Sequence, residues 1–290
     1  MTGEAMLIAQ ITDIHLGFHP GDPDEPNRRR LDRTLKALAE TAPRPDLLLV
    51  TGDLAEEGDD LVSYRALREA LADLPFPAHF ALGNHDSRAP FLQVFPEQPT
   101  ADGFVQYALD EGSLRILVLD TLEEGRHGGN LCESRAAWLA DRLAEAPGRP
   151  TLIVLHHPPV ATGLSWMSEN PDAPWVERLR GIVAAHPNIV ALVAGHLHRP
   201  IVTGWAGTVL VVCPSTAPQV ALDLAPIDAE QPDGRPMIVA DAPGYALHRW
   251  DGAALTTHFE SAQDHEVLAA FGPALQPLVR MLEGERARPV

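Results

Sequence analysis

The chain has 290 residues, 45% of which are hydrophobic, and it carries a formal net charge of −18 at pH 7. The length allows one large domain or two small ones, and the hydrophobic fraction is typical of a globular protein with a sizeable core. The acidic balance argues against binding to a nucleic acid polymer, whose recognition depends on basic surface, although a metal site could still attract a small anion.

Cysteine content and hydropathy bear on the cellular compartment. Cys132 and Cys213 are far apart and lack metal-type spacing. We interpret them as unpaired thiols in a reducing compartment, with a single disulfide as the alternative. Residues 1–5 contain an acid and no basic cluster, which argues against a signal peptide. No apolar run approaches the roughly 20 residues that span a bilayer, so we expect a cytoplasmic protein with no membrane partner.

The first 86 residues predict a β-α-β-α-β order in which polar side chains follow every strand. The expected strands are 6–12, 47–51 and 78–82, and the expected helices are 31–41 and 60–72. Asp13 and His15 follow the first strand at positions i and i+2, which project to the same side of an extended chain. Asp53 follows the second strand after a glycine, and the sequence Gly83-Asn84-His85-Asp86 follows the third. Each group alone could be an ordinary turn.

The second half continues the same pattern. An antiparallel pair is expected at 104–109 and 114–120, strands at 151–155 and 188–194, and helices at 133–144 and 175–185. His156 and His157 end the first of these later strands and are followed by two prolines. The last strand ends in Gly195-His196-Leu197-His198, which again places two imidazoles at i and i+2.

The remaining sequence carries weaker signals. We expect strands at 208–213, 238–241, 244–249 and 254–259, a loop at 214–219, an inserted surface loop at 223–237 and a partly helical segment at 265–285. No internal repeat occurs. The chain therefore divides into a main domain of residues 1–260 and a C-terminal helical extension of residues 261–290, which we interpret as a rim or an oligomer contact.

Five predicted strand ends thus carry groups that bind metals. The ligand types are nitrogen and oxygen without thiolate, which suits Zn, Mn, Fe, Co or Ni rather than a structural cysteine-zinc site. Seven or more ligands exceed the need of one ion, so two ions that share a carboxylate such as Asp53 are the simpler explanation. Two ions roughly 3.5 to 4 Å apart suit a phosphate ester, with a bridging hydroxide as the attacking group.

These residues resemble the calcineurin-like metallophosphoesterase superfamily. Its pattern of D-x-H, G-D, G-N-H-[DE], a strand-end H and G-H-x-H appears here in order and without departures, from residue 7 to about residue 198. The HHPP sequence at 156–159 and the CPST sequence at 213–216 resemble the class III cyclic-nucleotide phosphodiesterase and glycerophosphodiesterase branch. The resemblance implies an α/β fold, the four-layer α/β/β/α metallophosphoesterase sandwich, with residues 1–260 as the catalytic domain.

The resemblance also implies a role for each site residue. The expected ligands of two divalent or trivalent transition metal ions (Mn, Fe, Zn or Co) are Asp13, His15, Asp53, Asn84, His157, His196 and His198. Asp13, His15 and His198 would hold one ion, Asp53 would bridge, and the others would complete the second. His157 is chosen because H-x-P matches the family block, with His156 as the alternative. His85 would contact the phosphate or the leaving group, and Asp86 would orient its imidazole.

The expected activity is hydrolysis of small phosphodiesters, such as 3′,5′-cyclic nucleotides or glycerophosphodiesters, by attack of a metal-bridged hydroxide. A phosphomonoesterase, protein phosphatase or nucleotide pyrophosphatase on the same site is the enzymatic alternative, and an inactive metal-binding interaction scaffold is the non-enzymatic one. A homo-oligomer is compatible with the sequence. The other histidines are assigned to packing or surface, namely His19, His79, His127, His186, His248, His258 and His265. Trp166 and Asn170 are left open as substrate contacts.

Overall fold

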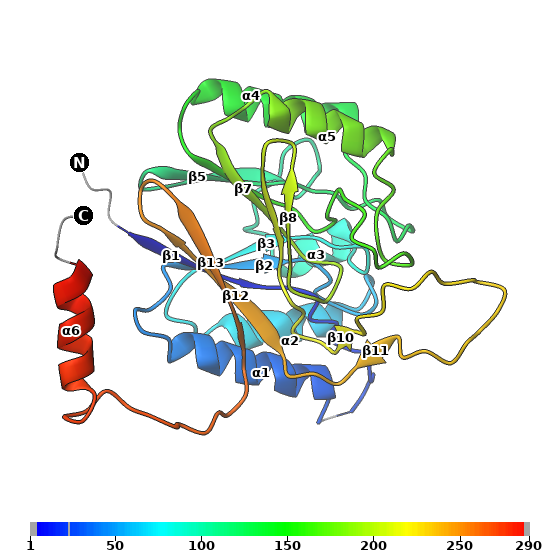
Figure 1. Ribbon diagram of the computed structural model, residues 1–290. Helices are drawn as coiled ribbons and strands as arrows, with labels where there is room; N and C mark the ends of the chain where they lie inside the picture. Colours follow the sequence, from blue (N-terminus) through cyan, green and yellow to red (C-terminus); the bar gives the residue numbers. More distant parts are fainter. Residues whose placement is uncertain (1–4, 23, 287–290) are drawn as a thin grey trace.

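Two β-sheets pack face to face between two groups of helices (Figure 1). This arrangement is seen in a computed structural model that describes residues 5–22 and 24–286. The first sheet has the strand order β13-β12-β1-β2-β3, and the second has the order β4-β5-β6-β7-β9-β8. The expected four-layer α/β/β/α sandwich is thereby confirmed. Residues 1–4, which belong to the stretch used against a signal peptide, and the last four residues of the C-terminal extension lie outside the described residues.

The first sheet is built on three parallel strands, β1 (Met6–Ile11), β2 (Leu47–Thr51) and β3 (Ala78–Ala81). They are connected by α1 (Pro26–Ala39) and α2 (Leu61–Leu71), whose apolar faces pack against the sheet. Every residue of β2 is buried, as expected for a strand covered on both faces. Parallel strands place their carboxyl ends at one edge of the sheet, so the polar groups that follow them come together there.

Two helices at this side differ from the sequence expectation. α1 begins at Pro26 rather than at residue 31, because Pro26 occupies the first helical turn and the Glu25 carboxylate accepts a hydrogen bond from Arg28 N at 2.7 Å. α3 (Arg88–Val94) was not predicted. Its seven residues are too few for a clear helical period, and the packing of Phe91 into the core defines it instead.

The second sheet combines an antiparallel edge with a parallel centre. Its strands are β4 (Tyr107–Glu111), β5 (Leu114–Val118), β6 (Thr151–Val154), β7 (Ile189–Ala194), β8 (Ile201–Trp205) and β9 (Thr208–Val212). Along β6 the side chains alternate: Leu152 and Val154 belong to the core between the sheets, whereas Ile153 packs beneath α4 (Glu133–Glu145) and α5 (Pro174–Ala184). β8 was not predicted, because its exposed residues alternate with half-buried ones at the sheet edge.

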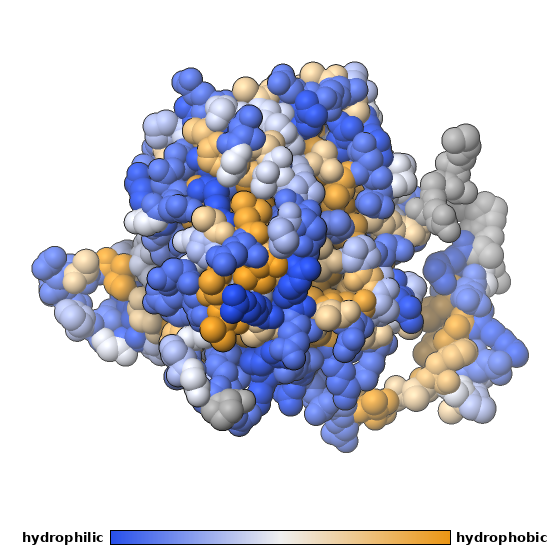
Figure 2. Space-filling view, turned by 180° about the vertical axis from the view of Figure 1, so that it is seen from behind, coloured by the Kyte–Doolittle hydropathy of each residue, from blue (hydrophilic) through white to orange (hydrophobic). Residues whose placement is uncertain are grey.

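The C-terminal third completes the first sheet. β12 (Gly244–Trp250) pairs antiparallel with β1, and β13 (Leu255–Ser261) forms the edge. A separate two-stranded sheet, β10 (Gln219–Val220) with β11 (Ile238–Val239), closes the inserted loop. α6 (Gln276–Arg286) stands away from the body of the molecule, at the right of Figure 2, and none of its described side chains is buried. The division at residue 260 stays a prediction. Within residues 5–22 and 24–286, no helix is long and apolar enough to cross a membrane.

A buried polar network crosses the interface between the sheets. The Gln10 amide nitrogen donates to Thr51 Oγ1 at 2.8 Å and to the carbonyl of Ala194, in the opposite sheet, at 3.1 Å. Because this nitrogen is already committed, Gln10 Oε1 is free to accept from His248 Nε2 at 3.0 Å, and His248 Nδ1 then accepts from the Thr257 hydroxyl at 2.8 Å. His248 is therefore buried as a neutral imidazole, and burial lowers its pKa to about 4.

His248 should make stability depend on pH. Because its folded pKa lies below the ordinary value of 6.5, its contribution is complete above pH 6.5 and is lost as the pH falls toward 4. A shift of this size corresponds to about 2–3 kcal/mol at pH 4.5. Urea unfolding at pH 7.5 and pH 4.5 should show that His248→Gln loses less free energy of unfolding on acidification than the parent, by about that amount. Equal losses in the two proteins would contradict this role.

Candidate metal centre

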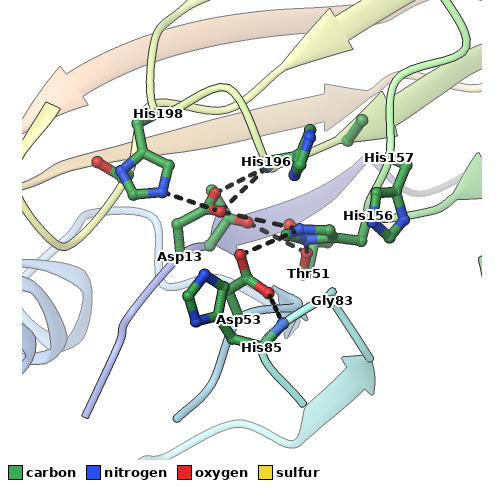
Figure 3. Close-up of polar contacts among 12 residues, drawn as sticks. Asp13, Thr51, Asp53, Gly83, His85, His156, His157, His196 and His198 are labelled. Atoms are coloured by element: carbon green, nitrogen blue, oxygen red, sulfur yellow. Dashed lines mark hydrogen bonds and ion pairs between the residues drawn. The ribbon is translucent and has the colours of Figure 1, made fainter. Parts of the chain in front are cut away.

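The carboxyl ends of five parallel strands, three from the first sheet and two from the second, meet in one cluster of polar side chains (Figure 3). The residues come from the loops after β1, β2, β3, β6 and β7, as the sequence predicts. Five of these residues adopt the left-handed backbone conformation that side chains rarely adopt, with φ between 49° and 72°: Asp13, His15, Asp53, His196 and His198. Such strain concentrates at functional sites, because the surrounding structure must hold it in place.

Two glycines let the strand ends approach closely enough. A Cβ atom at Gly83 would lie 2.2 Å from Asp53 Oδ1, and one at Gly52, where φ is +98°, would lie 2.3 Å from His156 Nδ1. Both contacts are closer than any real Cβ contact, so a side chain at either position would push a candidate ligand away. The absence of a side chain at Gly83 therefore lets this strand end lie against Asp53.

The first group of candidate ligands consists of Asp13, His15, Asp53 and His198, all of which are buried or nearly so. His198 Nε2 lies 3.3 Å from Asp13 Oδ1, and His15 Nε2 lies 3.7 Å from Asp53 Oδ2. The two Nε2 atoms are only 3.2 Å apart. One point between these atoms is therefore within reach of two imidazoles and two carboxylates.

Hydrogen bonds at the opposite ring nitrogens orient these imidazoles. His15 Nδ1 lies 2.8 Å from Glu56 Oε2, and this hydrogen bond lowers the pKa of Glu56, so the carboxylate accepts and Nδ1 donates. His198 Nδ1 donates to the Pro218 carbonyl at 2.9 Å, and His156 Nδ1 donates to the Thr51 carbonyl at 2.7 Å. In a neutral imidazole whose Nδ1 carries the proton, Nε2 presents a lone pair. The three lone pairs then converge, an arrangement that a bound cation stabilises.

The second group contains His156, whose Nε2 approaches the same Asp53 oxygen, Oδ2, as His15 Nε2 does. His156 Nε2 is 3.3 Å from Asp53 Oδ2 and 4.0 Å from Asp13 Oδ1. His156, His157 and His196 also place ring nitrogens close enough together to share an ion. Four buried polar atoms here have no hydrogen-bond partner among the described residues: Asn84 Oδ1, His156 Nε2, His157 Nε2 and His196 Nδ1. Buried donors and acceptors are nearly always satisfied, so four orphaned atoms in one place indicate a ligand.

His156 and His157 occupy different places in this group. The His156 ring points toward Asp53 and Asp13, whereas His157 lies further from both carboxylates (Figure 3). His157 Nδ1 is 2.9 Å from the Thr121 hydroxyl. The geometry therefore favours His156 over His157 as the group that shares an ion with Asp53.

His85 lies at the edge of the cluster, and Glu56 rather than Asp86 orients its ring. Its Nδ1 donates to the Glu56 carbonyl at 2.8 Å, and its ring stands at 77° to that of His15, with 4.6 Å between centroids. The Asp86 carboxylate makes no hydrogen bond to this imidazole. This buried carboxylate instead accepts from Gly83 N at 2.9 Å and Tyr64 Oη at 3.1 Å, and from the backbone of residues 54 and 55. The expected orienting role of Asp86 is corrected: it braces the loops that carry Asp53 and Asn84.

The electrostatics of the cluster favour a cation. Burial raises the pKa of Asp13 and of Asp53, but the adjacent histidines outweigh this effect and hold both carboxyl groups below their usual pKa. Burial lowers the pKa of His156, and the two carboxylates then raise it to about 9. Burial together with the charge on His156 lowers the pKa of His196 to about 3, so that His196 stays neutral and able to bind a metal. Metal binding at this site should displace the proton of His156.

The residues present therefore fit two transition-metal ions. The donor set is mixed nitrogen and oxygen, the ligand atoms are buried and convergent, and the ring nitrogens on the far side are held by carbonyl or carboxylate oxygens. The sequence predicted that these residues gather in one cluster, as they do in the structure, and their roles as ligands stay a prediction. The sequence did not point to Glu56 and Thr121, which hold ligand-type imidazoles. His127, assigned to packing or surface, has its ring centroid 4.6 Å from that of His196. A sequence offers no signal for such partners, because each is one polar residue in a loop.

Comparisons with known proteins agree with this geometry. Residues 6–200 match the family model described as calcineurin-like phosphoesterase. The chain is 37% identical over 284 residues to a probable cyclic nucleotide phosphodiesterase of Rhodopseudomonas palustris, covering 90% of this chain and 99% of that protein. It is 30% identical over 266 residues to a glycerophosphodiester phosphodiesterase of Enterobacter lignolyticus, covering 85% and 88%. The fold is similar to that of a dimetal phosphatase from Danio rerio, with a TM-score of 0.60 at 14% identity, covering 87% and 98%.

Proposed function

Because the chain belongs to the calcineurin-like phosphoesterase family, we propose that it is a metal-dependent hydrolase of small phosphodiesters such as 3′,5′-cyclic nucleotides or glycerophosphodiesters. The observation that carries this proposal is the convergence of three imidazole Nε2 atoms on the carboxylates of Asp13 and Asp53, in a cluster where four buried polar atoms have no hydrogen-bond partner among the described residues. Two relatives that are named as phosphodiesterases cover most of the chain, which supports a diester as the substrate.

We assign the metal ligands from the contacts above. Asp13, His15 and His198 would hold one ion, Asp53 would bridge, and Asn84, His156 and His196 would hold the other, with Mn, Fe, Zn or Co as the metals. His156 replaces His157 in this set because its Nε2 lies beside Asp53. When bound, such a pair supplies Lewis acidity toward the phosphoryl group and lowers the pKa of the attacking water.

The chain's own residues position the reacting group. The Thr51 and Pro218 carbonyls hold His156 and His198 in a single tautomer, so little reorganisation of these rings is needed when a substrate arrives. The Glu56 carbonyl fixes Nδ1 of His85, so that Nε2 can approach an oxygen of the ester. His85 borders the open cleft beside His15 and His198, where it can hydrogen bond to the phosphoryl or leaving oxygen.

A substrate panel tests this function. The purified protein, reconstituted separately with Mn, Fe, Zn and Co, is assayed with bis(p-nitrophenyl) phosphate, p-nitrophenyl phosphate, cyclic AMP and glycerophosphocholine. Diesters should be hydrolysed in preference to the monoester, a chelator should abolish turnover, and the matched His85→Ala protein should retain its metals while turning over on the order of 10²-fold more slowly. Preference for the monoester would indicate a phosphomonoesterase, and activity that persists in chelator would refute metal dependence.

A further inference from the structure

An open cleft of about 320 Å³ lies directly beside the metal centre. His15, His85 and His198 form its polar side, and Phe18, Trp166, Met167, Pro218 and Ile238 contribute an apolar side. The volume lies at the small end of the range for small-molecule sites. A phosphate group held at the polar side would therefore leave the rest of its ester against the apolar side.

Three large hydrophobic side chains of this wall are unusually exposed. Phe18 is 55% exposed, Ile238 is 53% exposed and Trp166 is 37% exposed. They come from three separate segments, namely the loop after β1, the loop between β6 and α5, and β11. Neither Phe18 nor Trp166 belongs to a hydrophobic core cluster, so core packing does not account for them. Exposed apolar side chains that gather around a polar site are typical of a ligand-binding surface.

The wall is anchored to the rigid part of the molecule. Met167 and Val220 belong to a small buried cluster with Leu164, Leu197 and Val212, beneath the cleft. Trp166 is therefore adjacent in sequence to a fixed residue, and Ile238 pairs directly with Val220 across the two-stranded sheet. These contacts support the Trp166 and Ile238 side of the wall next to the metal centre.

Several polar groups in the cleft are already committed. The Glu56 carboxylate is bound to His15 Nδ1, and the Asn27 side-chain amide donates to the His15 carbonyl. His127 and the second carboxylate oxygen of Glu56 remain to pair with the hydroxyls of a glycerol moiety. Hydroxyls that lie against Phe18 and Trp166 would be desolvated without compensation. A planar heteroaromatic base gains from the same surface, because stacking on an aromatic side chain is favourable for every base.

We propose that Phe18 and Trp166 are specificity-determining residues that hold the planar base of a nucleoside phosphodiester and so favour it over glycerophosphodiesters. This inference rests on the proposed function, because it assumes that the phosphate lies at the metal centre. It selects between the two substrate classes that the relatives leave open.

Matched variants test whether Phe18 and Trp166 favour nucleoside phosphodiesters over glycerophosphodiesters. The ratio of kcat/KM for cyclic AMP to kcat/KM for glycerophosphoethanolamine is measured for the parent, Trp166→Ala, Phe18→Ala and Trp166→Phe. Each alanine variant should lower the ratio about 10-fold, within the range of roughly 5- to 150-fold expected for loss of one stacking partner, and Trp166→Phe should restore most of it. Phe271→Ala, which removes a 72% exposed ring outside the cleft, is the control and should not change the ratio. An unchanged ratio in both alanine variants overturns the inference.

A binding measurement separates this inference from the proposed function. Saturation-transfer NMR with adenosine, which has no phosphate, should show stronger transfer to the adenine protons than to the ribose protons, and the signal should weaken in Trp166→Ala. Hydrolysis of diesters without base-selective transfer would overturn the inference while leaving the function intact. Base-selective transfer in a protein that hydrolyses no diester would overturn the function while supporting the base site.

Discussion

Asp53→Asn is expected to abolish turnover almost completely, by on the order of 10³-fold or more, and to reduce the content of both metals. Asp53 Oδ2 lies near Nε2 of both His15 and His156, so its negative charge is placed to stabilise a cation in either group of candidate ligands. An asparagine keeps the oxygen that accepts from His85 N at 2.8 Å, which should preserve the local fold. Metal content by elemental analysis, turnover of bis(p-nitrophenyl) phosphate and the midpoint of thermal unfolding are the measurements.

Asp73→Asn is the matched control for this change. It removes one negative charge from an exposed position just after α2, outside the cluster. Its metal content and turnover should equal those of the parent. If Asp53→Asn bound two metals per chain with the affinity of the parent, the bridging assignment would be incorrect. If it lost activity only because it unfolded, the thermal midpoint would show this.

His156→Ala is expected to have the second-largest effect, and His157→Ala is its matched comparison. Both side chains are fully buried, so both alanine variants create similar cavities and similar losses of stability. Only His156 places Nε2 beside Asp53, so His156→Ala should lose one metal per chain and on the order of 10²–10³-fold in turnover. His157→Ala should keep two metals and lose no more than about 10-fold, the effect expected of a supporting residue.

Comparing the two alanine variants decides whether His157, chosen from the H-x-P motif, or His156, favoured by the geometry, is the metal ligand. Isothermal titration of each metal-free variant with Mn²⁺ or Co²⁺ gives the number of sites directly. Loss of a site in His157→Ala, with both sites retained in His156→Ala, would restore the assignment made from the H-x-P spacing. A loss in both variants would indicate that the two imidazoles share one ion with His196, which their proximity permits.

The fold was largely predictable from the sequence, because buried strands and amphipathic helices carry strong local signals. β2 and β6 are short apolar runs, and α2 and α5 were predicted within two residues of their bounds. The elements that were missed or shifted depend on other forces. The early start of α1 depends on Pro26 and the Glu25 cap, and α3 depends on packing of Phe91. β8 is an edge strand defined by its pairing with β9 rather than by its own pattern.

By itself, the sequence determined the fold class, the family and the strand ends that carry the candidate site. It could do so because the order of ligand-type residues after buried strands can be read directly along the chain. Only the tertiary structure supplied the contacts from which the separate roles of those residues are proposed. Three contacts depend on distances between loops more than 25 residues apart. They are the approach of His156 to Asp53, the hydrogen bond from Leu54 N to Asp86, and the hydrogen bond between His15 and Glu56. Spacing along the chain cannot report such distances, because packing of the two sheets sets which ring nitrogen faces which carboxylate. The same packing brings Phe18 and Trp166 to one cleft, although 147 residues separate them in the sequence.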